Sequence, residues 1–135
     1  MKLFLDTNIV VDSVKFREPY VYEVMPIFQM GDAGIHQLLI SDLTFANVAY
    51  LAKRGGTTLS QLYELLIDLR SHVHVVIVGQ DCVDAALHLR PKDFEDALQY
   101  FAAKQANADY IITRNKKDFG FSDIPVLEPG EFLLR

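Results

Sequence analysis

Short apolar runs alternate along this chain with longer stretches in which apolar residues recur every three or four positions. The short runs are bounded by polar residues, Gly or Pro, and this pattern is typical of buried strands. They predict five strands, at residues 2–5, 37–40, 73–78, 110–113 and 124–127. The run Val73–Val78 is almost entirely β-branched and is hydrophobic throughout, so it predicts a central strand covered on both faces.

Between these strands, apolar positions at helical spacing predict helices. We expect a short helical turn at 9–12, helices at 20–30, 43–54, 59–69, 80–88 and 94–106, and a final turn from Pro129. Ser41-Asp42 stands where the N-cap of one helix is expected, and either Thr57 or Thr58 could cap the next. Strands that alternate with helices imply parallel β-α units. The sequence therefore predicts one α/β domain over residues 1–135, a three-layer α/β/α sandwich around a central, mainly parallel sheet of four or five strands.

The composition narrows the classes of protein that fit. At 135 residues, half of them hydrophobic, the chain can bury a core without metal or disulfide. Cys82 is the only cysteine, which excludes an internal disulfide and a cysteine-based zinc site. We expect a cytoplasmic protein, because the sequence shows neither a signal peptide nor a membrane-spanning run. The net charge of −5 argues against broad electrostatic coating of nucleic acid, although the basic residues Arg114, Lys116 and Lys117 could still meet phosphates locally.

The candidate chemistry begins at Asp6, directly after the first predicted strand. Taken alone, Asp6 is explained by helix capping. In an open parallel sheet, however, ligands bind beyond the carboxyl ends of the strands. The topology would bring two further acidic segments there, Asp93–Ala97 and Thr113–Phe119. Hard divalent cations such as Mg²⁺ and Mn²⁺ need only two or three carboxylates, so metal-assisted phosphodiester hydrolysis is a coherent chemistry for this site.

Four fragments, in their order and spacing, resemble the PIN-domain nucleases, which include the VapC-like toxins of bacterial toxin–antitoxin pairs. The fragments are Leu5–Asn8, Ser41–Thr44, Asp93–Leu98 and Ile111–Phe119, and the resemblance spans nearly the whole chain. It implies a single-stranded RNA endonuclease that uses Mg²⁺ or Mn²⁺ held by a cluster of acids. It also implies an antitoxin protein as partner and a homodimer.

Residue by residue, the resemblance makes Asp6 the first acid of the cluster and Asp96 the acid on the later helix. It implies that Thr7 or Asn8 supports the waters of the metal and that Thr113 lies beside the site.

The chain departs from the family pattern at two positions. Asn47 stands where the family has a glutamate, and Asn115 stands where another aspartate is common. An Asn side chain brings no charge and cannot act as a base. Asp118 is a possible substitute, which gives Asp6, Asp96 and Asp118 as the predicted metal ligands.

Several of these residues also have a simpler structural explanation, and other functions fit the sequence. Asp93 and Asp96 could form the acidic first turn of a helix, and Asp118 could belong to a turn. A PIN-like module that binds RNA or protein with little catalysis is the alternative function, favoured by Asn47 and Asn115. A phosphatase or nucleotide-binding enzyme fits less well, because the sequence has no Walker loop, no Gly-rich dinucleotide motif and no second aspartate in Asp6–Asn8.

Overall fold

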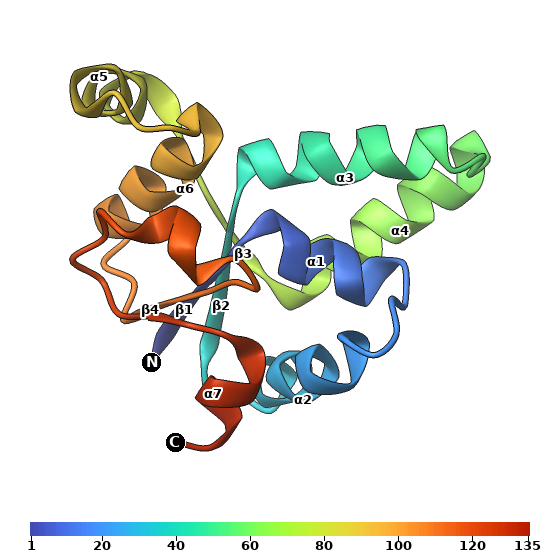
Figure 1. The fold of residues 1–135 in the computed structure, drawn as a ribbon. Coiled ribbons are helices and arrows are strands. Elements are labelled where there is room, and N and C mark those ends of the chain that lie inside the picture. Colours follow the sequence, from blue (N-terminus) through green and yellow to red (C-terminus); the bar gives the residue numbers. More distant parts are fainter.

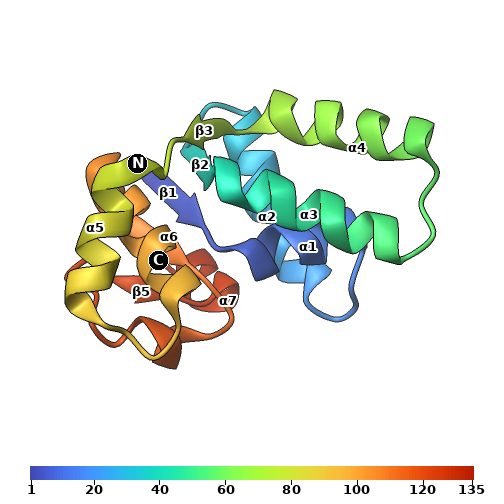
Figure 2. The ribbon, with the colours of Figure 1, turned by 90° about the horizontal axis from the view of Figure 1, so that it is seen from above.

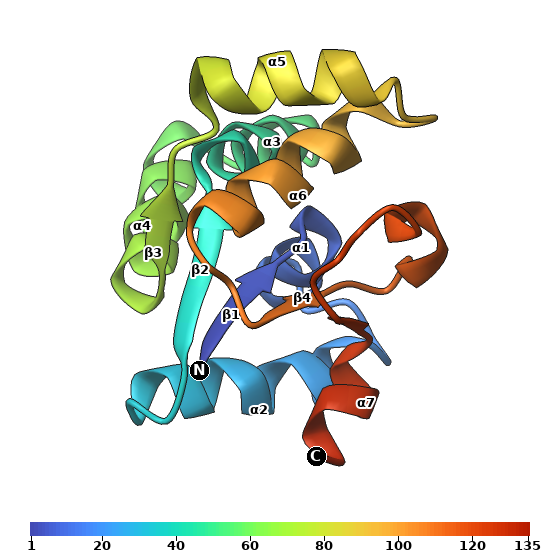
Figure 3. The same ribbon diagram turned by 90° about the vertical axis from the view of Figure 1, so that its left-hand side faces the viewer.

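Five parallel strands form the central layer of the computed structural model, which describes residues 1–135 (Figure 1). The strands are β1 (Lys2–Leu5), β2 (Gln37–Ser41), β3 (His74–Val76), β4 (Tyr110–Ile112) and β5 (Val126–Leu127), in the spatial order β3-β2-β1-β4-β5. Figure 3 shows β1 and β2 running in the same direction, with α1 and α3 leaving their ends. The predicted α/β class and the number of strands are confirmed.

Seven helices and a 3-10 turn connect or follow the strands. They are α1 (Thr7–Val14), α2 (Val21–Asp32), α3 (Asp42–Arg54), α4 (Leu59–His72), α5 (Gly79–Leu89), α6 (Phe94–Gln105), η1 (Lys116–Phe119) and α7 (Pro129–Leu133). The predicted caps are present: Ser41 Oγ accepts from the Thr44 amide at 3.2 Å, and Thr58 forms a capping box with Gln61. None of the helices is both long and apolar enough to cross a membrane.

Alternation along the strands divides the core between the two faces of the sheet. On β1, Leu3 and Leu5 join the larger cluster, which contains residues of α1, α2, α3, α4 and α7, whereas Phe4 joins the smaller one with α5 and α6. Figure 2 shows α5 and α6 on one side of the strands and α2, α3 and α4 on the other. Both faces of β1 are therefore buried, as expected for a central parallel strand.

The order of the strands reverses direction between β1 and β4. From β1 the chain proceeds to β2 and β3 on one side and then crosses to β4 on the other side of β1. Ligands of open α/β sheets bind at such a reversal, outside the carboxyl ends of the strands. Asp6 follows β1 and Thr113 follows β4, and the Asp6 amide donates to the carbonyl of Ile112 at 3.0 Å, so both residues lie at the reversal.

Two predictions about individual elements are wrong. The run Val73–Val78 is no central strand: only residues 74–76 form β3, which pairs with β2 alone, and Val75 is 38% exposed. Its β-branched composition reports strand propensity, whereas its place in the sheet depends on the crossovers, which put it at an edge. The turn expected at 9–12 is instead the eight-residue helix α1, which Asp6 caps and which begins at Thr7, two residues before Ile9.

Candidate active site

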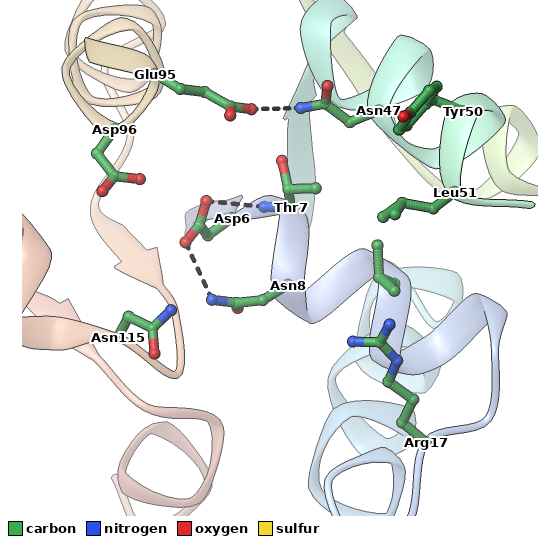
Figure 4. Close-up of a pocket in the computed structure, with 11 residues that line it drawn as sticks. Asp6, Thr7, Asn8, Arg17, Asn47, Tyr50, Leu51, Glu95, Asp96 and Asn115 are labelled. Atoms are coloured by element: carbon green, nitrogen blue, oxygen red, sulfur yellow. Dashed lines mark hydrogen bonds between the residues drawn. The ribbon is translucent and has the colours of Figure 1, made fainter. Parts of the chain in front are cut away.

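A pocket of about 360 Å³ opens at the carboxyl ends of β1 and β4 (Figure 4). Residues from α1, α3, α6 and the loop after β4 line it. Its polar lining includes three acids and three amides, namely Asp6, Glu95, Asp96, Asn8, Asn47 and Asn115. The structure thus brings Asp6 and Asp96 to one pocket, at the place expected for a ligand site.

Asp6 is held rigidly in the floor of this pocket, and its side chain is almost completely buried. Its Oδ1 accepts from the Thr7 amide at 2.8 Å, which caps α1. Its Oδ2 accepts from Thr113 Oγ1 at 2.8 Å and from Asn8 Nδ2 at 3.3 Å. A carboxylate has about four lone-pair directions, so these three donors leave about one for a ligand in the pocket. Asp6 can therefore cap the helix and also face a ligand.

Asp96 lies in the first turn of α6, where its amide donates to Asp93 Oδ1 at 3.1 Å. Figure 4 shows its carboxyl group pointing towards Asp6. Burial raises the pKa of Asp96 to about 7, and the charges of Asp6, Asp93, Asp118 and Glu95 contribute to the rise. The simpler explanation put both Asp93 and Asp96 in the acidic first turn of a helix; in the structure Asp93 is the N-cap of α6, and Asp96 lies in the first turn and also lines the pocket.

The pKa of Asp6 is also raised, chiefly by burial. The hydrogen bonds from Thr113 and Thr7 lower it, and the charges of Glu95 and Asp118 raise it. None of Asp6, Glu95 and Asp96 forms an ion pair with a basic side chain. The protein therefore pairs none of these three acids with a cation, and a bound cation would stabilise the charged forms of Asp6 and Asp96.

The donor set fits a hard divalent cation. No three Asp, Glu, His or Cys side chains are close enough to enclose a metal ion on their own. Mg²⁺ keeps several waters and is commonly held through one or two carboxylates, so such an enclosure is not needed. The acids and amides of the pocket offer oxygen ligands, which Mg²⁺ and Mn²⁺ prefer. Asp6 and Asp96 are the residues that would hold the ion.

A buried polar network lies next to the acids and joins three helices. Gln99 Nε2 donates to Thr7 Oγ1 at 3.3 Å and to Thr44 Oγ1 at 3.2 Å, and these two hydroxyls are 3.0 Å apart. Ser41 Oγ lies 3.3 Å from Thr44 Oγ1. Because Thr7 is on α1, Thr44 on α3 and Gln99 on α6, this network fixes the relative positions of the helices that carry the acids.

The other predicted polar residues of the site line two neighbouring hollows. Asn47 and Asn115 line the pocket itself. Asp118, on η1, is exposed and lies in a neighbouring hollow that also contains Lys117 and is joined to the pocket through Asp96. Asn115 therefore occupies the loop position nearer to the pocket, and Asp118 approaches Asp96 from the other side.

The three predicted phosphate-binding cations have different surroundings. The Arg114 guanidinium donates to both carboxylate oxygens of the buried Asp12, at 2.6 and 3.2 Å, and lies over the Tyr20 ring. Lys116 pairs with Glu131 at 3.0 Å. Lys117 makes no ion pair, and it lies beside Asp118 in the neighbouring hollow. Of the three, Lys117 is the cation most available to a phosphate.

Sequence reasoning assigned no role to Glu95, Arg17, Tyr50 or Gln99. Glu95, Arg17 and Tyr50 line the pocket, and Gln99 fixes the helices next to it. One signal was present in the sequence for Glu95, since it directly precedes Asp96 at the start of a helix. Adjacent residues in the first turn can both reach a pocket that lies beyond the helix end.

The raised pKa of Asp96 predicts a pH-dependent stability. Between the ordinary value of 3.8 and about 7, the folded protein keeps a proton that the unfolded chain has lost, so stability falls as pH rises through this window. Asp96→Asn, which imitates the protonated form, should flatten the fall and stabilise the metal-free protein at pH 8 by ~1 kcal/mol, after allowance for solvent screening. Thermal unfolding in EDTA from pH 5 to 8 measures this dependence of stability on pH.

The control for this measurement is Asp84→Asn, at an exposed position on α5. An equal pH slope in wild type and Asp96→Asn would contradict the prediction.

Comparisons with known proteins agree with this geometry. A family model described as "PIN domain" matches residues 2–117. Ribonuclease VapC1 of Aquifex aeolicus (strain VF5) is 30% identical, over 99% of this chain and 94% of that protein. A toxin–antitoxin complex from Klebsiella pneumoniae contains a chain with a TM-score of 0.69 and 28% identity, over 94% of this chain and 97% of that one. A chain of VapBC2 from Rickettsia felis, solved with a DNA fragment from its promoter, has the same fold, with a TM-score of 0.70. It is 20% identical, over 95% of this chain and 98% of that one.

Proposed function

This chain belongs to the PIN domain family, and we propose that it is a metal-dependent endonuclease that hydrolyses phosphodiester bonds in single-stranded RNA. The observation that carries the proposal is the convergence of Asp6 and Asp96, without a cationic partner, at the reversal of the strand order. The similarity to a ribonuclease over almost the whole chain supports RNA as the substrate.

In this proposal, the protein supplies a rigid, negatively charged frame. Thr7, Asn8 and Thr113 fix Asp6, while Asp96 faces it from α6. A bound Mg²⁺ or Mn²⁺ supplies Lewis-acid stabilisation of the charge that develops on the phosphoryl group and lowers the pKa of the attacking water. Fixed ligands require little reorganisation during the reaction, which is how preorganised sites lower a barrier.

Residues at the edge of the pocket suit a single strand. Tyr50 is 61% exposed and lines the pocket, so its ring can stack on an unpaired base. Arg17 lines the same pocket, and Lys117 lies near Asp96 on its other side. These cations can contact the phosphates on either side of a scissile bond, which reconciles RNA binding with the acidic net charge.

The second candidate is a PIN-like module that binds RNA or protein with little catalysis. Asn47 and Asn115 favour it, because both bring neutral amides to the lining of the pocket. The two functions differ in whether the protein, given RNA and a divalent metal, yields cleaved RNA.

The test uses purified protein with a single-stranded RNA and a stable hairpin, each incubated with Mn²⁺, with Mg²⁺ or with EDTA. The expected result is cleavage of the single strand with either metal and no product in EDTA. RNA binding without metal-dependent products would establish the binding module instead.

We further propose that the protein is the toxin of a toxin–antitoxin pair and forms a homodimer. Support for the antitoxin comes from the solved relatives, since the Klebsiella pneumoniae chain belongs to a toxin–antitoxin complex. Co-expression with the product of an adjacent small gene should suppress cleavage and give a stable complex. The mass of the isolated protein in solution tests the dimer.

A further inference from the structure

Asn47 and Glu95 face each other across the pocket (Figure 4). Asn47 lies on α3 and Glu95 on α6, and Asn47 Nδ2 donates a hydrogen bond to Glu95 Oε1. This contact holds an otherwise exposed carboxylate over the pocket. It also joins α3 to α6 directly beside Asp6 and Asp96.

Apart from Asn47, no side chain of the protein binds the Glu95 carboxylate. Glu95 Oε2 takes part in no hydrogen bond or ion pair, and Glu95 has no basic neighbour within ion-pair distance. Glu95 lines the same pocket as Asp6 and Asp96. An exposed glutamate that only supported the helix dipole would gain nothing from being fixed here by an amide.

From this geometry we infer that Glu95 is a third acidic residue that binds the divalent cation, through a water of its hydration shell, and that Asn47 is the residue that orients it. The inference rests on the proposed function, because it assigns a further cation-binding residue to the same site. It accounts for the amide at position 47, where the resemblance predicts a glutamate: the amide donates to a carboxylate that reaches the pocket from α6 instead of α3. Two facing carboxylates would repel each other, whereas an amide and a carboxylate bind each other.

The inference predicts that the carboxylate and the amide can be exchanged between positions 47 and 95. Glu95→Gln removes the carboxylate, and we expect it to weaken Mn²⁺ binding at least about tenfold, as the loss of a residue that acts on a metal from outside its direct ligands commonly does. The double variant Asn47→Glu with Glu95→Gln returns a carboxylate to the pocket from α3 and keeps an amide opposite it, so most of the lost affinity should return. Asn47→Leu keeps Glu95 but removes its donor, and a smaller loss of affinity is expected.

The experiment measures the Mn²⁺ dissociation constant by calorimetry, and by the electron paramagnetic resonance signal of free Mn²⁺, for wild type and each variant. RNA cleavage is followed in parallel. Glu64→Gln, at an exposed position on α4 outside the pocket, is the matched control and should bind Mn²⁺ as the wild type does. Circular dichroism and thermal unfolding show whether each variant is folded.

The outcomes separate this inference from the function on which it rests. Wild-type affinity in Glu95→Gln, with affinity lost in Asp6→Asn, would overturn the role of Glu95 and leave the nuclease proposal standing. Wild-type protein that binds Mn²⁺ but cuts no RNA would refute the nuclease, and the affinities would still decide whether Glu95 helps to bind the cation. A wild type that does not bind Mn²⁺ would refute both. Failure of the exchanged variant to recover affinity would overturn the role assigned to the Asn47–Glu95 pair.

Discussion

Replacing either Asp6 or Asp96 with Asn is expected to abolish metal-dependent RNA cleavage. The two carboxylates approach each other at the pocket and have no basic partner, so each supplies charge that the cation needs. Loss of one such preorganised group costs a rate factor on the order of 10² to 10³. Initial rates on a fluorescent single-stranded RNA, with saturating Mn²⁺, measure the effect.

The Asn variants are suited to this test because they keep the shape of the site. Asn is as good an N-cap as Asp, so Asp6→Asn should retain α1. Asp118→Asn, measured beside them, decides whether Asp118 belongs to the ligand set, as the sequence predicts, or acts only through its charge near Asp96. Cleavage at the wild-type rate by the Asp6 or Asp96 variant would remove that residue from the mechanism.

Much of the fold could be predicted because local signals and tertiary structure agree in this chain. The short apolar runs form strands, and Ser41 and Thr58 cap the helices where the sequence predicts caps. The position of Asp6 at the pocket follows from the strand that precedes it and from the parallel topology. These features depend on a few neighbouring residues, which is the information that a single sequence carries.

The features that escaped prediction depend on contacts between distant segments. The run Val73–Val78 has the composition of a central strand, yet the crossovers place it at an edge. Glu95 acquires a partner only because α3 and α6 line the same pocket, and its partner Asn47 is 48 residues away in the sequence. The partner of Arg114 is likewise distant, since Asp12 lies on α1. Neither residue type nor spacing reveals such pairs.

Replacing Arg114 with Met is expected to destabilise the protein strongly. Asp12 is completely buried, and the Arg114 guanidinium is its bidentate partner at 2.6 and 3.2 Å, whereas Arg17 lies 4.0 Å away. Removing one partner of a buried ion pair costs about 3 to 5 kcal/mol, because the remaining buried charge loses its close partner. Urea unfolding followed by circular dichroism measures the loss in free energy of unfolding.

Two further variants separate this structural role from the RNA contact that the sequence predicts for Arg114. Asp12→Asn combined with Arg114→Met removes both charges, so the double variant should be more stable than Arg114→Met alone. Lys117→Met removes an exposed cation that makes no ion pair, so RNA binding should weaken while stability stays within about 0.5 kcal/mol of wild type. If Arg114→Met instead kept full stability and lost RNA affinity, the guanidinium would be a phosphate contact. Its bond to a buried carboxylate leads us to expect that Arg114 anchors the loop after β4 to α1, and that Lys117 is the cation of this loop that meets RNA.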